Sequence, residues 1–328
     1  MQDAKGKCFQ PYEAGFPEQF TQGLECDEAI RLNGNGLSTL LTPLKPIQDE
    51  TPVVGIDVSS IRIGETETGV ICAVRGAVVW NEKRRYRYLR LGPFPFHVNE
   101  ENRREVFDSL GERPSSVLRV GASTSLEVQS LLCNVVERWV QMGVSYSAEG
   151  NVILWDGSLT AGTPGNPMSI VSGILEIARS NSNHVLAFSK ATSIRFLKWR
   201  ITDLVQRQEP PCLFEVEGLP LSILKTRRLL GRMYVSKLSR GGCSFRLDID
   251  RTLSREEGIL AVERLLGNEL VFQGYPETLR LAHICSTFTA NDVMGIQSWL
   301  TQRYGLKAVN RQSMRRRLFG PFGTGFED

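Results

Sequence analysis

Apolar and polar positions alternate in blocks along the chain, and the first clear blocks predict strands. Apolar runs bounded by turn residues predict strands at residues 52–63, 67–80 and 84–96. Short connections join these three segments, so we expect an antiparallel meander. The third segment interleaves arginine and tyrosine, which is typical of an exposed strand face but also suits phosphate contacts and base stacking in nucleic-acid binding.

A helical period follows the meander. Apolar residues recur at three-and-four spacing over residues 125–143, which predicts an amphipathic helix of about five turns that ends at Gly143. A short helix is also expected at 99–110. An apolar strand at 152–155, a helix at 169–182 and a strand at 183–193 come next, and this order implies a right-handed parallel crossover.

The remainder of the chain predicts two strands followed by helices. The strands fall at 231–239 and 243–249, and Ser254 and Glu257 form the capping box of a helix at 254–267. Residues 274–305 are expected to be largely helical. We therefore divide the chain into an N-terminal arm or helical extension (1–50), a core domain (51–305) and a basic C-terminal tail (306–328).

Composition is that of an ordinary globular protein. The 328 residues carry a net charge of +3, while residues 1–50 hold four Lys/Arg and eight Asp/Glu, so the rest of the chain is mildly basic. The seven cysteines are scattered without the spacing of a zinc or redox pair. Neither a signal peptide nor a membrane-spanning apolar run is evident, which predicts a cytoplasmic protein without a membrane partner.

Two aspartates stand where apolar runs end. Asp156 closes the run NVILWDGSL, and Asp57 closes PVVGID. A carboxylate at the mouth of a buried strand is costly unless a cation or hydrogen-bond donors meet it, which suggests a metal ligand or a catalytic acid. Since Asp-Gly is also a common turn dipeptide, Asp156 taken alone fits a turn residue equally well.

The order of the elements brings these carboxylates together. Three antiparallel strands followed by helix, parallel strand, helix and parallel strand describe an α/β, ribonuclease-H-like fold, with a mixed sheet flanked by helices and the first and fourth strands side by side. Glu127, in the first turn of the intervening helix, can reach the same point, and it is favoured over Glu137 further along that helix. Clustered carboxylates suit Mg²⁺ or Mn²⁺ and metal-assisted phosphodiester hydrolysis.

Several segments resemble the NurA nuclease family. They occur in order between residues 53 and 300: DVSS, LWDGSL, FSKAT, YVSKLS, FRLDI and, most specifically, GYPETLRLAH. The resemblance implies a ribonuclease-H-like (Piwi-like) core and manganese-dependent DNA degradation from 5′ to 3′, with two metal ions per site and single-strand endonuclease activity. It also implies a homodimer that acts with the HerA-type hexameric ATPase in DNA end resection and double-strand-break repair.

The resemblance also assigns site residues. It implies that Asp57, Asp156, Glu127 and His283 bind metal, and that Tyr275 joins them in catalysis. Candidate DNA-binding residues are Lys190, Ser158, Lys237 and Arg246. A lone helical histidine is otherwise a packing residue, and a strand-end lysine such as Lys190 is as often a surface residue as a phosphate ligand.

Other classes of function are alternatives to a nuclease. A catalytically weak ribonuclease-H-like protein that binds nucleic acid or serves as an assembly partner is the principal alternative. A nucleotide-dependent metabolic enzyme would require a glycine-rich loop after a strand, and the chain has none in convincing context. The absence of Cys/His pairing and of a Ser-His-Asp order argues against thiol or serine hydrolysis.

Overall fold

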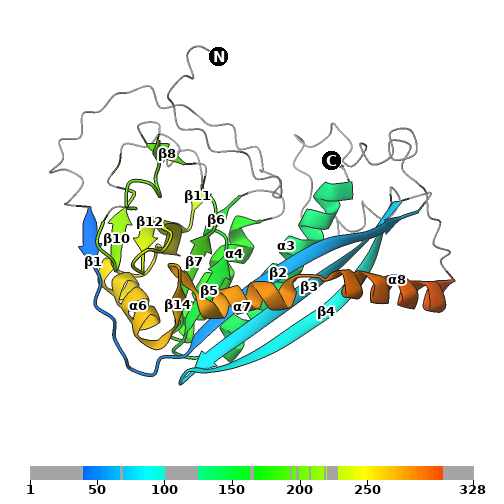
Figure 1. The fold of residues 1–328 in the computed structure, drawn as a ribbon, viewed down its shortest axis with the longest axis horizontal. Helices are drawn as coiled ribbons and strands as arrows, with labels where there is room; N and C mark the ends of the chain where they lie inside the picture. The colour runs from blue at the N-terminus through cyan, green and yellow to red at the C-terminus, as the bar shows by residue number, and fades with distance from the viewer. Residues whose placement is uncertain are drawn as a thin grey trace, which may run out of the picture.

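A nine-stranded mixed sheet forms the centre of the protein (Figure 1). The computed structural model describes residues 40–66, 69–99, 125–162, 166–192, 194–196, 199–206, 208–217, 219 and 228–305. The strand order is β1-β10-β12-β13-β7-β5-β2-β3-β4. In chain order the strands are β1 (Leu41–Pro43), β2 (Val53–Glu65), β3 (Gly69–Glu82), β4 (Arg85–Asn99), β5 (Val152–Asp156), β7 (His184–Ser189), β10 (Cys212–Glu215), β12 (Gly231–Lys237) and β13 (Phe245–Asp250).

The middle of the sheet is parallel and its two sides are antiparallel. β2 pairs with β5 and β5 with β7 in parallel, while β2, β3 and β4 form an antiparallel meander. The predicted meander, the predicted parallel pairing and the predicted neighbourhood of the first and fourth strands are all confirmed. The fold is α/β with a ribonuclease-H-like core, as the sequence indicates.

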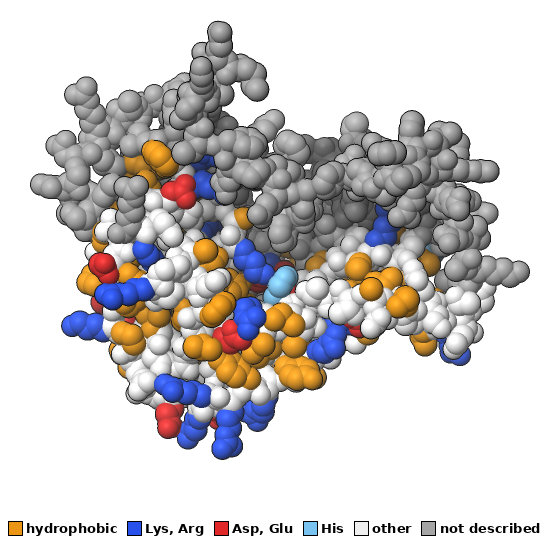
Figure 2. Space-filling model, viewed as in Figure 1, with side chains coloured by type: hydrophobic (Ala, Val, Ile, Leu, Met, Phe, Trp, Pro, Cys, Tyr) orange, Lys and Arg blue, Asp and Glu red, His pale blue; other side chains and the backbone are white. Residues whose placement is uncertain are grey.

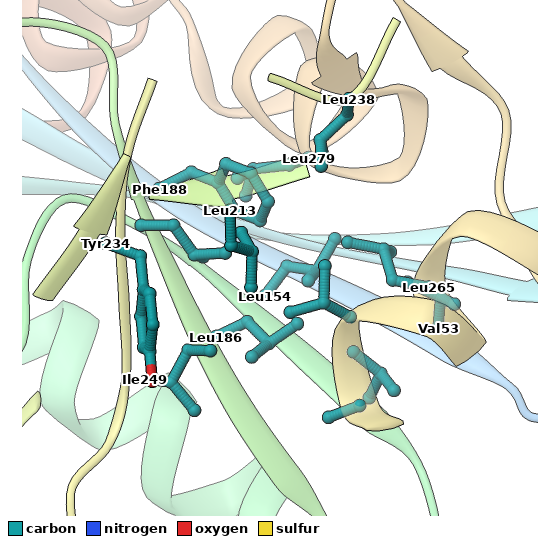
Figure 3. Close-up of a cluster of buried hydrophobic side chains, with 14 of the residues drawn as sticks. Val53, Leu154, Leu186, Phe188, Leu213, Tyr234, Leu238, Ile249, Leu265 and Leu279 are labelled. Carbon is teal, nitrogen blue, oxygen red and sulfur yellow. The ribbon is translucent and has the colours of Figure 1, made fainter. Parts of the chain in front are cut away.

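Helices cover both faces of the sheet (Figure 1). Apolar residues of α3 and α4 pack on the face that carries Ile56 and Trp155, and those of α6 and α7 pack on the opposite face against Val53 and Leu154. Figure 3 shows the second of these clusters, in which side chains from the strands meet Leu265 of α6 and Leu279 of α7. The helices are α3 (Ser125–Ser147), α4 (Met168–Ser180), α6 (Arg255–Asn268), α7 (Glu277–Ser286) and α8 (Ala290–Tyr304).

Helix α7 lies directly on strand β2. At Gly55, a Cβ atom would come within 2.8 Å of the carbonyl oxygen of Thr278, so only glycine permits this approach. Beyond α7, helix α8 runs along the protruding ends of β2, β3 and β4 (Figure 1). Buried Arg75 of β3 fixes its start through a 2.8 Å ion pair with Asp292. These two helices therefore have defined positions on the first hairpin.

Some elements differ from the sequence predictions. Helix α3 continues through Gly143 to Ser147, because a glycine with open space around it is tolerated inside a long, packed helix. Strand β1 comes from the segment that the sequence assigns to an N-terminal extension, and it joins the sheet by pairing with β10. The helix predicted at 99–110 lies almost wholly outside the described residues, and position 99 ends β4.

Three small antiparallel ribbons complete the described part of the chain. They pair β6 (Thr160–Ala161) with β11 (Arg228–Leu229), β8 (Arg195–Phe196) with β9 (Trp199–Arg200), and β14 (Val271–Phe272) with β15 (Tyr275–Pro276). The predicted capping box of α6 is present at Ser254 and Glu257. Among the described residues, we find no helix with the length and apolarity needed to cross a membrane.

Candidate active site

Asp57 and Asp156 lie side by side where the parallel pairing of β2 and β5 ends. Asp156 is the last residue of β5, whereas β2 continues beyond Asp57 to Glu65, so the predicted strand exit is wrong for Asp57. β2 and β5 pair in register as far as Ile56 and Trp155, so the aspartates are the next residues on each strand. Asp57 is 7% exposed and the side chain of Asp156 is 17% exposed. The sheet thus places two of the predicted carboxylates next to one another at a partly buried edge.

Helix α7 adds a third group to these carboxylates. His283 Nδ1 lies 3.3 Å from Asp57 Oδ2, and the Ser286 hydroxyl donates a hydrogen bond to the same oxygen. One potential ligand atom each from Asp57, Asp156 and His283 lies within 4.8 Å of the others. The His283 side chain is 49% exposed, so the group is open to a substrate from this side.

Lys190 and Tyr275 border the carboxylates. Lys190, which follows β7, forms a 2.5 Å ion pair with Asp156, and its Nζ lies 5.8 Å from the centre of the Tyr275 ring. The Tyr275 hydroxyl is buried beside Asp156 without a hydrogen bond of good geometry within the described structure. On the face shown in Figure 2, basic side chains flank α7 and hydrophobic side chains lie along it.

The two aspartates have pKa values that shift in opposite directions. Burial raises the pKa of Asp57, but the hydrogen bonds from His283 and Ser286 outweigh burial and leave that pKa below its usual range. Burial, followed by the charge of Asp57, raises the pKa of Asp156, and Lys190 offsets only part of this rise. A divalent cation between the carboxylates would relieve their repulsion.

Tyr275 and His283 also have shifted pKa values. Burial and the nearby charges of Asp156 and Asp57 raise the pKa of Tyr275, so its hydroxyl keeps its proton at neutral pH. The hydrogen bond to Asp57 raises the pKa of His283. The protonated Tyr275 hydroxyl can therefore donate a hydrogen bond, and His283 in its charged form can donate a proton, at the exposed side of the carboxylates.

Glu137 of α3, the helix on the opposite face of the sheet, is also under the electrostatic influence of the two aspartates. Its side chain is 19% exposed and accepts a 2.8 Å hydrogen bond from Gln141. Burial raises the pKa of Glu137; Arg138 opposes this rise, and the charges of Asp57 and Asp156 add to it. The charges of both aspartates therefore act on the Glu137 carboxylate. The side chain of Glu127 lies outside the described residues.

The predicted DNA-binding residues occupy different environments. Lys190 belongs to the cluster described above, and Ser158 follows Asp156 by two residues, with its hydroxyl 2.9 Å from that of Thr160. Lys237 and Arg246 are buried. The Lys237 ammonium donates to the carbonyl oxygen of Gln206, and the Arg246 guanidinium forms a bidentate pair with Asp248 at 2.7 and 2.6 Å. Lys237 and Arg246 thus bind other groups of the protein, as residues that support the fold do.

Sequence reasoning missed two buried polar residues that hold the carboxylates. Ser286 and Gln141 are both 0% exposed, and they bind Asp57 and Glu137 respectively. Ser286 follows His283 by three residues, the spacing that puts two side chains on one face of a helix. The spacing of three residues from His283 could have indicated Ser286 from the sequence. In the same way, the spacing of four residues from Glu137 could have indicated Gln141.

The donor set fits a hard divalent cation. Two carboxylates and an imidazole meet at a partly buried point, and carboxylate oxygens are the ligands that Mg²⁺ and Mn²⁺ prefer. Burial and the charge of Asp57 raise the pKa of Asp156 more than Lys190 lowers it, so a cation here would stabilise the charged carboxylate. Asp57, Asp156 and His283 are therefore the residues able to hold such an ion.

The fold and this cluster together define a ribonuclease-H-like α/β protein with an acidic cluster that could hold a metal ion. Among solved structures, the chain is similar to the NurA nuclease from Sulfolobus solfataricus, with a TM-score of 0.55 and 16% identity over 82% of this chain and 89% of that one. It is also similar to NurA with manganese, with a TM-score of 0.53 and 9% identity over 84% and 93% of the two chains. The chain therefore has a NurA-like fold.

Weaker similarity extends to another nuclease. The alignment with Endonuclease V from Bacillus subtilis covers 82% of this chain and 90% of that one at 10% identity. Its TM-score is 0.39, which is too low to support a conclusion about this chain. No protein-family model matches the sequence, and no curated protein matches it significantly. The comparisons thus establish the fold and do not establish the function.

Proposed function

We propose that this protein is a divalent-metal-dependent nuclease that hydrolyses phosphodiester bonds in DNA. The observation that carries the proposal is the meeting of Asp57, Asp156 and His283 within 4.8 Å at the point where the parallel pairing of β2 and β5 ends. Its fold is that of the NurA nuclease structures. Carboxylates in this position suit cations that bridge substrate phosphates.

Each residue of the cluster has a role in this proposal. Asp57, Asp156 and His283 hold the cation or cations, for which Mn²⁺ is the first candidate because one NurA structure of this fold contains manganese. Divalent cations activate a water nucleophile and neutralise charge on phosphate oxygens. Lys190 exchanges its ion pair with Asp156 for a phosphate contact as substrate enters, and the protonated Tyr275 donates to a phosphate oxygen.

Glu137 is our candidate for the glutamate ligand from the helix. The charges of Asp57 and Asp156 both act on its carboxylate, and Gln141 orients it by a 2.8 Å hydrogen bond. We therefore give it preference over Glu127. Replacing each glutamate by glutamine tests this assignment: Glu137→Gln should reduce cleavage at least tenfold, as loss of a ligand or its support typically does, while Glu127→Gln should cleave like the wild type. If Glu127→Gln loses cleavage and Glu137→Gln cleaves like the wild type, Glu127 is the glutamate ligand.

The resemblance of the sequence to NurA nucleases supports further proposals. These are 5′ to 3′ degradation of single- and double-stranded DNA, single-strand endonuclease activity, two ions per site, a homodimer, and a role with a HerA-type hexameric ATPase in end resection and break repair. We also propose cytoplasmic action. Lys237 and Arg246 are not included among the DNA contacts in this proposal, because both are buried and bound to protein groups.

Cleavage of end-labelled DNA tests the central proposal. The purified full-length protein should cut single- or double-stranded DNA with Mn²⁺ or Mg²⁺ and should not cut with EDTA. Asp57→Ala should abolish cutting, whereas Asp203→Ala, which removes an exposed aspartate elsewhere, should leave it unchanged. Cutting in EDTA, or full activity of Asp57→Ala, would refute the proposed site. Tight DNA binding without cutting under any metal would support the binding-module alternative instead.

A further inference from the structure

Ser286 is the residue that connects the end of α7 to the candidate metal site. It closes the helix and is 0% exposed. Its hydroxyl donates to Asp57 Oδ2, the oxygen that also lies 3.3 Å from His283 Nδ1. Two donors from one turn of one helix thus act on a single carboxylate oxygen, although only His283 is exposed enough to meet a substrate.

Strand β2 holds Ser286 from a second direction. The Ser59 hydroxyl donates a 2.6 Å hydrogen bond to the backbone carbonyl of Ser286. Asp57 and Ser59 are alternate residues of the same strand, so they project on the same face of the sheet. The backbone and the side chain of Ser286 are therefore both fixed to β2, which leaves its hydroxyl little freedom to move relative to Asp57.

The Ser286 hydroxyl has a choice of acceptors. It lies 3.0 Å from the carbonyl oxygen of His283, as is common for a serine near a helix end. A hydroxyl has one proton, and a carboxylate is a stronger acceptor than a neutral carbonyl. The proton is therefore directed to Asp57, and the contact with the carbonyl of His283 is secondary. A purely helix-terminating role for this serine would not require a buried charged partner.

We propose that Ser286 is a positioning residue that orients the Asp57 carboxylate for a divalent cation. By engaging Oδ2, Ser286 and His283 fix the rotation of the carboxylate and make Oδ1 the oxygen that we expect to bind the cation. Mutating a residue that hydrogen-bonds to a metal ligand typically lowers metal affinity or activity by about 10- to 100-fold. This inference rests on the proposed metal-dependent function, because it assigns Ser286 a role toward the same ion.

Calorimetric titration of the metal-free, full-length protein with Mn²⁺ tests the inference without relying on activity. Ser286→Ala should weaken Mn²⁺ binding by about 10- to 100-fold. Ser286→Thr, which keeps the hydroxyl, should restore most of the affinity. Ser145→Ala is the matched control, because Ser145 is also a serine with 0% exposure in a helix, but its hydroxyl has no partner among the described residues. It should bind Mn²⁺ like the wild type.

The outcomes separate this inference from the proposed function. If the wild type binds no Mn²⁺, the metal-dependent function itself fails. If the wild type binds and Ser286→Ala binds equally well, or Ser145→Ala is weakened as much as Ser286→Ala, the positioning role is overturned. Should Ser286→Ala not fold, Ser286→Cys replaces it under the same criteria, because it retains the side-chain shape and has a weaker donor.

Discussion

Substituting Gly55 by alanine tests whether the position of α7 on β2 creates the site. A Cβ atom at this position would lie 2.8 Å from the carbonyl oxygen of Thr278, 2.9 Å from its carbonyl carbon and 3.0 Å from the backbone nitrogen of Leu279. All three are backbone atoms of α7 and cannot rotate away. To reach an ordinary contact distance of 3.4 Å from the 2.8 Å contact, the helix has to move by about 0.6 Å.

This displacement should act on stability and on the site together. Overpacking of this kind costs about 1–3 kcal/mol of unfolding free energy. Because His283 already lies 3.3 Å from Asp57, a shift of α7 should break that contact and reduce cleavage by about tenfold or more. Urea unfolding measures the first effect, and cleavage of labelled DNA with Mn²⁺ measures the second.

Gly64→Ala provides the matched control. Gly64 lies on the same strand, but a Cβ atom there would have nothing within 4 Å. This variant should be at least as stable as the wild type, since alanine reduces the conformational freedom of the unfolded chain. Equal stability and equal activity of the two alanine variants would refute the argument that close packing of α7 on β2 determines the geometry of the site.

Two carboxylates outside the candidate site, one half-buried and one buried, should contribute to stability. Arg75 lowers the pKa of Asp292, so this ion pair stabilises the fold above the usual carboxyl pKa of 3.8. Asp292→Asn should cost about 1–3 kcal/mol at pH 7, and urea unfolding should show this difference shrinking as pH falls below 3.8; a constant difference down to pH 2 would contradict the assignment. Glu269, 8% exposed, accepts hydrogen bonds from the backbone and hydroxyl of Thr278. Glu269→Gln should cost about 1.5–3 kcal/mol, whereas Glu256→Gln on the surface of α6 should cost little.

The sequence predicts the acidic edge well because its signals are local. Asp57 and Asp156 each end an apolar run, and the order of strands and helices is enough to make the two strands neighbours. His283 was identified by its motif, and the structure places it beside Asp57. These inferences need only the direction of each strand and the side on which a helix packs.

Other features depend on geometry that no local pattern records. Whether Glu127 or Glu137 meets the aspartates depends on the rotation of α3 about its axis and its position over the sheet. Pairing of β1 with β10 joins segments about 170 residues apart, and neither strand has a strong period of its own. From the sequence, Arg246 is a candidate DNA contact, whereas in the structure Asp248, two residues later on the same face of the strand, pairs with it.

Anomalous diffraction at the manganese absorption edge, from crystals grown with Mn²⁺, tests the central claim most directly. The account predicts at least one anomalous peak between the carboxylates of Asp57 and Asp156, within ligand distance of His283 or Glu137, and no such peak in crystals of Asp57→Ala. A fully occupied manganese site elsewhere on the protein, with none at this edge of the sheet, would contradict it.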